Sequence, residues 1–268
     1  MRSPSTLTLT GSAERWGPLW GARPADWALS EDQQVPTYEA ALDRVDLQPG
    51  QAVLDIGCGV GAFLRLAAGR GARPFGIDAS EGLIALARER LPDADLRVGE
   101  MEALPYDDHS FDLVTGFNAF FFAEHVVNAV REAGRVAKPG ARVVVQVWGA
   151  HAHNDLEAMK EIARPYFPPR PADAPAEPDY SAPGVLEDIA SAAGLSPEAA
   201  FNLTWAFQFP DEGTMTRALA APAGLAVLIG PERAPEFRRA LIEGLAAYRQ
   251  PDGSYRLNNQ YHYLIARA

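Results

Sequence analysis

Only one cysteine, Cys58, occurs in the 268-residue sequence. A single thiol excludes an intramolecular disulfide and a cysteine-rich zinc site. No stretch approaches the ~20 apolar residues that a membrane-spanning helix needs. The first ten residues contain no apolar run of the kind found in signal peptides. We therefore expect a cytoplasmic protein that does not enter a membrane.

Positive charge is also scarce. Lys and Arg total 24 against 35 Asp and Glu, which gives a formal net charge of −11. The sequence has no Lys/Arg run that could form a basic patch, and an acidic surface repels phosphate backbones. The composition therefore disfavours a nucleic-acid partner. Hydrophobic residues make up 47% of the chain, enough for a sizeable core.

Short apolar runs alternate with helical segments from residue 51 onward, and no segment repeats another. The run 52–56 ends at Gly57, as expected of a buried parallel strand. This alternation predicts an α/β fold with a parallel sheet and helices on both faces. Ligands bind at the edge where the carboxyl ends of such strands meet. Strands are predicted over 52–56, 74–78, 96–98, 111–117, 142–148, 200–209 and 255–266, and helices over 60–69, 81–90, 125–137 and 184–194.

The strongest motif is the glycine-rich turn that follows the first predicted strand, within Val53–Gly61. Glycines let the backbone adopt positive φ and approach a ligand closely. In the dinucleotide fingerprint the third glycine comes three positions after the second, whereas Gly61 comes two after Gly59. Asp55 lies two residues before the first glycine, and a buried acid there would repel a pyrophosphate. The turn therefore suits a cationic amino-acid group better than a dinucleotide.

A second acid, Asp78, ends the second predicted strand about 20 residues beyond the glycine turn, a spacing at which an acid can accept hydrogen bonds from ribose hydroxyls. One acid for an amine and another for a ribose together describe the binding of an amino-acid nucleoside.

Taken in order, these motifs resemble the class I S-adenosylmethionine-dependent methyltransferases, especially the small-molecule branch that includes ubiquinone and menaquinone methyltransferases. The resemblance implies a Rossmann-like, doubly wound, mostly parallel seven-stranded sheet with the last strand antiparallel, plus helical lid insertions. It also implies S-adenosyl-L-methionine as cofactor and no metal. The matching segments cover roughly residues 50–150 and are Val53–Gly61, Gly76–Ser80, Gly99–Tyr106, Ser110–Asp112 and Arg135–Gly140.

The same resemblance implies a role for each cofactor-binding residue. The methionine part would be held by Asp55 and by the backbone of Gly57, Cys58, Gly59 and Gly61. The ribose would be held by Asp78, with Ala79 and Ser80 beside the adenine. Glu100 would receive the adenine amino group, and the Met101 N–H would face a ring nitrogen. Phe117 and Asn118 would lie near the sulfonium.

Three regions are expected. Residues 1–50 would form an N-terminal helical cap, 51–150 the S-adenosylmethionine-binding core, and 151–268 the lid insertions and the C-terminal strands of the same domain. The insertions, 151–182 and 211–249, leave from the carboxyl edge of the sheet and should arch over the site. Their apolar residues suggest an enclosed pocket for a partly apolar acceptor; they are Met159, Tyr166, Phe167, Met215, Leu219, Leu225, Leu228 and Phe237.

The acceptor side of the site is less defined by the sequence. Trp20, Trp148 and His153 are candidate substrate-binding residues, and His151 is a candidate general base, since a histidine can accept a proton near neutral pH. The alternative for both histidines is a solvated loop position. Two aromatic groups, Trp16, Trp20 and Trp27 in the cap and Phe120, Phe121 and Phe122 after the fourth strand, either line the site or only pack in the core.

The expected activity is methyl transfer to a small molecule by in-line displacement, and a homodimer is compatible with the sequence. Methyltransferases of nucleic-acid amino groups carry an Asn/Asp-Pro-Pro-aromatic motif after the fourth strand, where this chain has Asn118-Ala119-Phe120-Phe121. Two alternatives stay open: a protein that binds the cofactor only as a cation, without methyl transfer, and a nicotinamide-dependent oxidoreductase, which the glycine spacing disfavours.

Overall fold

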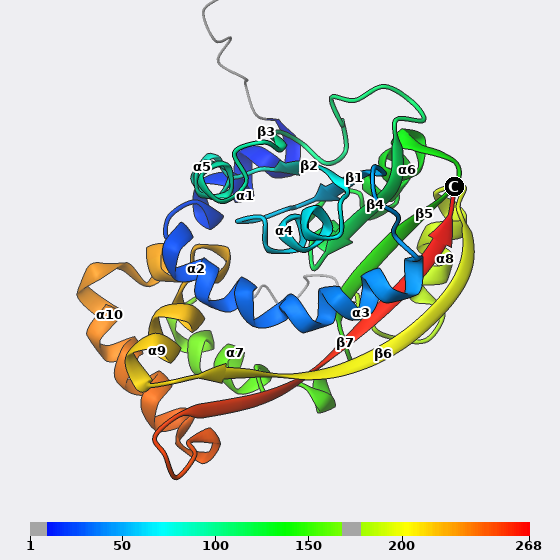
Figure 1. Ribbon diagram of the computed structural model, residues 1–268. Coiled ribbons are helices and arrows are strands. Elements are labelled where there is room, and N and C mark those ends of the chain that lie inside the picture. Colours follow the sequence, from blue (N-terminus) through cyan, green and yellow to red (C-terminus); the bar gives the residue numbers. More distant parts are fainter. Residues whose placement is uncertain (1–9, 168–177) are drawn as a thin grey trace, which may run out of the picture.

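A computed structural model describes residues 10–167 and 178–268 of the chain. Its centre is a seven-stranded sheet with the strand order β3-β2-β1-β4-β5-β7-β6 (Figure 1). β7 is antiparallel to both neighbours, and the remaining pairs are parallel. The predicted doubly wound fold with an antiparallel last strand is confirmed. The strands are β1 Ala52–Ile56, β2 Arg73–Asp78, β3 Asp95–Val98, β4 Phe111–Phe117, β5 Ala137–Trp148, β6 Ser196–Phe209 and β7 Tyr255–Arg267.

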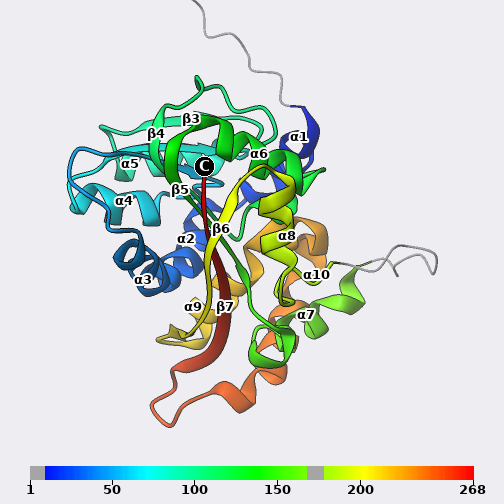
Figure 2. The ribbon, with the colours of Figure 1, turned by 90° about the vertical axis from the view of Figure 1, so that its right-hand side faces the viewer.

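Helices cover both faces of the sheet (Figure 2). Apolar side chains of α3, α4 and α5 are buried on one face, and those of α6 and α8 on the other. The α-helices are α1 Gly11–Trp20, α2 Pro24–Glu31, α3 Val35–Val45, α4 Ala62–Gly69, α5 Glu81–Arg90, α6 Val126–Val136, α7 Glu157–Ala163, α8 Val185–Ala192, α9 Glu212–Ala220 and α10 Leu225–Gly244. Short 3-10 helices are η1 Asp32–Gln34, η2 Phe120–Phe122, η3 His151–His153, η4 Arg164–Tyr166, η5 Pro222–Gly224 and η6 Ala246–Tyr248.

Two predicted strand starts were too late in the sequence. β5 begins at Ala137, not at residue 142, because Ala137 pairs with Phe111 before a register irregularity. β6 begins at Ser196, not at residue 200, because its first residue already pairs with Arg267. Residues 1–9 of the predicted cap, and residues 168–177 of the first predicted insertion, lie outside the described residues.

The long β6–β7 ribbon positions the second half of the chain. β6 pairs with β7 from Ser196 opposite Arg267 to Phe209 opposite Tyr255, whereas β5 pairs only with the Tyr261–Arg267 half of β7. The other half of the ribbon therefore runs on beyond the carboxyl ends of the parallel strands (Figure 1). α9 and α10 bury apolar side chains against this projecting half. The ribbon thus carries the predicted lid beside the edge where ligands bind.

The N-terminal helices meet this lid directly. α2 packs on α9, and the hydroxyl of Ser30 donates to the carbonyl oxygen of Ala218 over 2.9 Å. Asp26 forms an ion pair with Arg217, with 2.6 Å between Oδ1 and Nη2. Cap and lid, far apart in sequence, therefore close over the sheet edge together.

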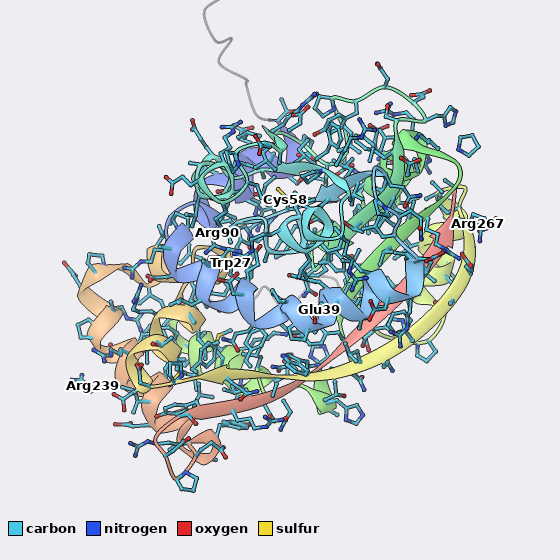
Figure 3. The ribbon with its side chains drawn as sticks, viewed as in Figure 1. Trp27, Glu39, Cys58, Arg90, Arg239 and Arg267 are labelled. Carbon is cyan, nitrogen blue, oxygen red and sulfur yellow. The ribbon has the colours of Figure 1, made fainter. Side chains whose placement is uncertain are left out.

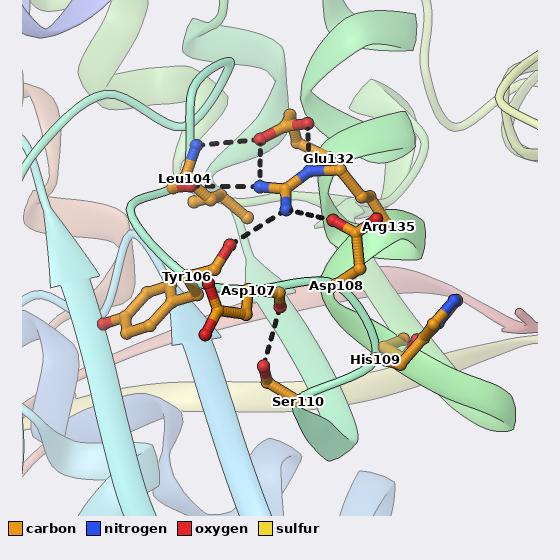
Figure 4. Close-up of polar contacts among 9 residues, drawn as sticks. Leu104, Tyr106, Asp107, Asp108, His109, Ser110, Glu132 and Arg135 are labelled. Carbon is orange, nitrogen blue, oxygen red and sulfur yellow. Dashed lines mark hydrogen bonds and ion pairs between the residues drawn. The ribbon is translucent and has the colours of Figure 1, made fainter.

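One arginine fixes the loop between β3 and β4 (Figure 4). Arg135 on α6 donates to the carbonyl oxygens of Leu104 and Tyr106 at 3.0 and 2.9 Å. Glu132 accepts from Arg135 at 2.7 Å and from the Leu104 nitrogen at 2.9 Å, and its pKa is lowered mainly by the hydrogen bond from Arg135. Loop residues upstream, including Met101, are thereby held at the sheet edge.

Candidate active site

A cavity of about 340 Å³ lies at the carboxyl edge of the sheet, within the usual size range for small-ligand sites. Most of its lining comes from the cap helices, the turns after β1, β2 and β4, the segment after β5 and the segment around α9, and Phe63, Leu83, Met101 and Phe207 also contribute. Predicted site residues in the lining are Trp20, Asp55, Gly57, Cys58, Gly59, Asp78, Ala79, Met101, Phe117, Asn118 and Trp148. Gly61, Ser80, Glu100, His151 and His153 do not line it.

Three glycines of the turn after β1 have positive φ, and two of them, Gly57 and Gly59, have no room for a side chain. Gly57 and Gly59 have φ values of +71° and +56°, a region that other residues rarely adopt. A Cβ on Gly57 would lie 2.5 Å from the Cβ of Ala119, and a Cβ on Gly59 would lie 2.2 Å from Glu31 Oε2. The turn is thus packed against both the end of β4 and the cap, with Cys58 buried between the two glycines (Figure 3).

Asp55, the last but one residue of β1, is buried and lines the cavity. Its Oδ1 accepts a hydrogen bond from the hydroxyl of Thr115 on β4 at 2.7 Å. Burial raises the pKa of Asp55 well above its ordinary value, since no cation among the described residues pairs with it. A positively charged ligand beside this carboxyl group would favour its ionised form.

Asp78, the last residue of β2, also lines the cavity. Its two oxygens accept from the backbone nitrogens of Gly59 and Ser80 at 2.9 and 2.8 Å. Burial raises its pKa, and the two backbone hydrogen bonds partly oppose that shift. Ser80 itself caps α5 by accepting from the Leu83 nitrogen at 3.1 Å. Asp78 therefore ties the glycine turn to the end of β2.

A third acid, Glu31 at the end of α2, was missed from the sequence. Its side chain is 4% exposed and accepts from the Trp27 indole at 2.7 Å and from the nitrogens of Val60 and Ala62 at 2.8 and 2.9 Å. Burial is the largest cause that raises its pKa, to about 7. Free N–H groups at a helix start normally attract anions. Glu31 accepts from one of them, the Ala62 nitrogen at the first position of α4, and from the Val60 nitrogen just before the helix.

Glu100 faces the cap and not the cavity. Its oxygens accept from the Ser12 hydroxyl at 2.8 and 2.9 Å, from the Ala13 nitrogen at 2.7 Å and from the Glu102 nitrogen at 3.1 Å. It thus caps the first turn of α1, where backbone N–H groups have no helical partner. Its neighbour Met101 does line the cavity. The contact of Glu100 with the adenine amino group therefore stays a prediction.

Aromatic side chains form one wall of the cavity. Trp20 packs edge-on against Trp27 and Phe122, with ring centroids 4.7 and 5.5 Å apart. Trp16 contacts Phe122 at 5.0 Å. All four line the cavity, as does Phe121. Phe120 instead lies in the core on the face of the sheet that α6 and α8 cover. Only two of the three consecutive phenylalanines therefore face the site.

The end of β4 meets the cap at Asn118, which has a φ of +52°. Its side-chain nitrogen donates to Gln34 Oε1 at 3.1 Å. The preceding Phe117 packs on Tyr38 of α3, with ring centroids 4.6 Å apart. Gln34 and Tyr38 also line the cavity and were missed from the sequence. Their signal is the spacing Trp27, Glu31, Gln34 and Tyr38, which places all four on one helical face.

The remaining wall comes from the two insertions. Leu156, Met159 and Lys160 line it after β5, together with Trp148 at the end of β5 and Phe207 on β6. Leu219, Pro222 and Ala223 line it at the end of α9. Both insertions thus lie over the same cavity as Gly57, as the lid interpretation expects.

The structure does not bring the two histidines to this cavity. His151 and His153 lie on η3, and both are exposed. His151 Nδ1 is 3.1 Å from Glu157 Oε1, and the His151 side chain is 69% exposed. Among the described residues no group of three or more His, Cys, Asp or Glu is arranged to hold a metal ion. η3 is therefore an exposed turn at the start of the first insertion.

The charges of the lining fit a cation. Glu31, Asp55, Asp78 and Glu157 are its acids, and Lys160 is the only Lys or Arg among its described residues. Lys160 pairs with Glu157, with 2.6 Å between Nζ and Oε1. A pyrophosphate at the glycine turn would face three carboxyl groups, and the first N–H of α4, at Ala62, already donates to Glu31. A ligand with a cationic amino-acid end and a ribose meets neither obstacle.

Comparisons with known proteins point the same way. Residues 54–145 match the family model of a methyltransferase domain. A demethylmenaquinone methyltransferase of Renibacterium salmoninarum is 36% identical over 139 residues, which cover 46% of this chain and 59% of that protein. A probable chloroplastic tocopherol O-methyltransferase of Oryza sativa is 32% identical over 171 residues, covering 59% of this chain and 45% of that protein. This chain spans about half the length of the curated relatives it matches.

Solved structures share the fold. The [4+2]-cyclase SpnF has a TM-score of 0.63 and 21% identity, with 98% of each chain covered. The YcgJ protein of Bacillus subtilis has a TM-score of 0.57 and 19% identity, covering 87% of this chain and 97% of that chain. The resemblance seen in the sequence motifs is confirmed for the core, residues 54–145.

Proposed function

We propose that this chain, whose residues 54–145 form a methyltransferase domain, uses S-adenosyl-L-methionine to methylate a small, largely apolar acceptor. The observation that carries the proposal is the position of Glu31, which accepts from the Val60 and Ala62 nitrogens at the start of α4 and lines an acidic cavity together with Asp55 and Asp78. That arrangement favours a sulfonium amino-acid nucleoside over a dinucleotide. Two relatives are named as a demethylmenaquinone methyltransferase and a probable tocopherol O-methyltransferase, and these names support an apolar acceptor.

Each part of the cavity has a task in this proposal. The carboxyl groups of Asp55 and Asp78 and the backbone of the glycine turn would hold the amino-acid end and the ribose. The aromatic wall of Trp16, Trp20 and Phe122 would cover the nucleoside. Bound there, the cofactor supplies a methyl group on a cationic sulfur, whose leaving group is a neutral thioether.

The cap and lid then act by orientation and by excluding water. Holding two reactants in line can supply much of a displacement's rate, and a closed cavity prevents competing hydrolysis. Residues of α2, α7 and α9 line the cavity together, so they can enclose the acceptor. The exposed His151 does not line the cavity, although its Nδ1 is 3.1 Å from Oε1 of the cavity-lining Glu157, and the proposal assigns it no step.

The test has two stages. Calorimetry should show that S-adenosylhomocysteine binds while NADH does not. Cofactor labelled in the methyl group should then transfer its label to apolar hydroxylated or quinol metabolites extracted from cells. Binding of NADH alone would overturn the proposal. Binding of the nucleoside without label transfer to any extract would instead favour a protein that only binds the cofactor.

A further inference from the structure

Two amide side chains that line the cavity, Gln34 and Asn118, form a hydrogen-bonded pair. Asn118 directly follows β4, and its backbone nitrogen donates to the Gln146 carbonyl at 2.8 Å. Its side-chain nitrogen donates to Gln34 Oε1 at 3.1 Å, which joins the end of β4 to the cap. Both side chains line the cavity. The next residue, Ala119, packs closely against Gly57 of the glycine turn, and residues of the lid line the same cavity.

Each amide in the pair has one unused polar atom. Asn118 Oδ1 is buried and has no hydrogen-bond partner in the described structure. Gln34 Nε2 likewise has no partner among residues 10–167 and 178–268, although Gln34 is 3% exposed. If both side-chain amides are rotated so that oxygen and nitrogen change places, the pair still has one free donor and one free acceptor. A buried polar atom without a partner is costly, so Asn118 Oδ1 calls for a ligand atom, and the free N–H groups of Gln34 beside it can donate to the same atom.

We infer that Gln34 and Asn118 together bind a hydroxyl group of the methyl acceptor. A hydroxyl donates one hydrogen bond and accepts others, so one oxygen atom satisfies both unused groups. A carboxylate only accepts, and the cavity acids Glu31, Asp55 and Asp78 would repel it. An ammonium group only donates and would leave the Gln34 N–H without an acceptor.

The surroundings define the rest of this acceptor. Tyr38, Phe117 and Phe207 contribute aromatic surface to the cavity, and Leu156, Met159 and Leu219 contribute aliphatic surface. The substrate class is therefore a hydroxylated apolar compound, held by one polar contact and otherwise by apolar burial. This inference rests on the proposed function, because it assigns the pair to the acceptor side of a methyltransferase cavity.

A matched pair of probes tests the hydroxyl. 2-Naphthol and 2-methylnaphthalene have nearly the same shape, and only the first carries a hydroxyl. In a purely apolar pocket the methyl compound binds more tightly, because burying a hydroxyl without partners costs free energy. We expect the protein saturated with S-adenosylhomocysteine to show the opposite order in equilibrium dialysis. 2-Naphthol should bind about tenfold more tightly, as two hydrogen bonds allow.

The variant Gln34→Met should reverse this preference while keeping the affinity for S-adenosylhomocysteine. Gln33→Met is the matched control, since Gln33 lies in the same turn but accepts from the Gln208 nitrogen, outside the cavity. It should bind both probes as the parent does. If Gln34→Met does not fold, the order of the two probes in the parent decides alone.

The outcomes separate this inference from the proposed function. Should the parent fail to bind S-adenosylhomocysteine, both are wrong. Should it bind that nucleoside but hold 2-methylnaphthalene as tightly as 2-naphthol, or more tightly, only the hydroxyl site is wrong. An unchanged preference in a folded Gln34→Met variant would also overturn the site.

Discussion

The backbone nitrogen of Ala62 donates to the carboxylate of Glu31 at 2.9 Å across 31 residues of sequence. This contact joins the last residue of α2 to the first residue of α4. It makes the cap a structural part of the glycine turn. The cap therefore takes part in forming the cofactor site, in addition to covering it.

The first prediction concerns the pH dependence of stability through Glu31. Its pKa is raised from 4.5 to about 7 by burial, and the carboxylate of Asp32 adds to the shift. The folded state therefore holds this proton more tightly than the unfolded chain does. The stability that Glu31 contributes is fully present below pH 4.5 and is lost as the pH rises through about 7. The difference amounts to at most about 3.5 kcal/mol, at ~1.4 kcal/mol for each pKa unit.

Urea unfolding of the parent and of Glu31→Gln checks this between pH 4.5 and 8. The free energy of unfolding of the parent, relative to the variant, should fall across that window. Glu39→Gln serves as control because Glu39 is exposed on α3, and its curve should stay parallel to the parent's. A constant difference between the parent and Glu31→Gln would contradict the buried, raised carboxyl group.

A second prediction concerns cofactor affinity. Asp78→Ala should weaken binding of S-adenosylhomocysteine by about 1–3 kcal/mol, because charge-assisted hydrogen bonds to the ribose are lost. Calorimetry measures the change directly. Asp93→Ala alters an exposed aspartate in the turn after α5 and should leave the affinity unchanged. Equal affinities for the two variants would reject the ribose role of Asp78.

Packing of the glycine turn gives a third prediction. Gly59 and Gly140 both have positive φ, but a Cβ on Gly59 would overlap Glu31 Oε2, whereas nothing lies within 4 Å of one on Gly140. Gly140→Ala should cost only the left-handed backbone penalty of about 1–2 kcal/mol. Gly59→Ala should cost a further ~1–3 kcal/mol, because the contact of Glu31 with the turn is lost. Urea unfolding at one pH compares the two variants. An equal loss of unfolding free energy in both would refute the close contact between Gly59 and Glu31.

The joint between cap and lid gives a fourth prediction. Arg217 and Asp26 form an ion pair, and the Arg217 side chain is 59% exposed. Arg217→Met should therefore lower the free energy of unfolding by less than about 1 kcal/mol. Met215, on the same helix, is 0% exposed, and Met215→Ala should cost about 2–5 kcal/mol. The opposite order in thermal or urea unfolding would mean that the ion pair, not apolar burial, holds α9.

The sequence predicts the sheet well because its strands are short buried runs bounded by local signals. Ala52–Ile56 ends at a glycine, and the predicted range 111–117 is the observed β4. The starts of β5 and β6 could not be read this way. Pro139 and Gly140 look like a loop in sequence, yet Ala137 before them pairs with Phe111. Cross-strand pairing, which no local pattern records, decided that boundary.

The site was predicted where residues act through a local motif and missed where they act across the fold. Asp55 and Gly59 belong to one turn, and both line the cavity. Glu31 and Gln34 reach it only because α2 and η1 pack on that turn. His151 was predicted from its place after β5. The chain there bends into an exposed turn, while Leu156 and Met159 face the cavity instead.

Glu31 and Gln34 lie outside residues 54–145, the part of the chain that matches the family model. Alignments confined to that shared part carry no information about either residue. Two homologues could keep the same glycine turn and still diverge in what they modify through a few exchanges on one face of the N-terminal helices. Similarity in the core domain therefore does not determine which compound each homologue modifies.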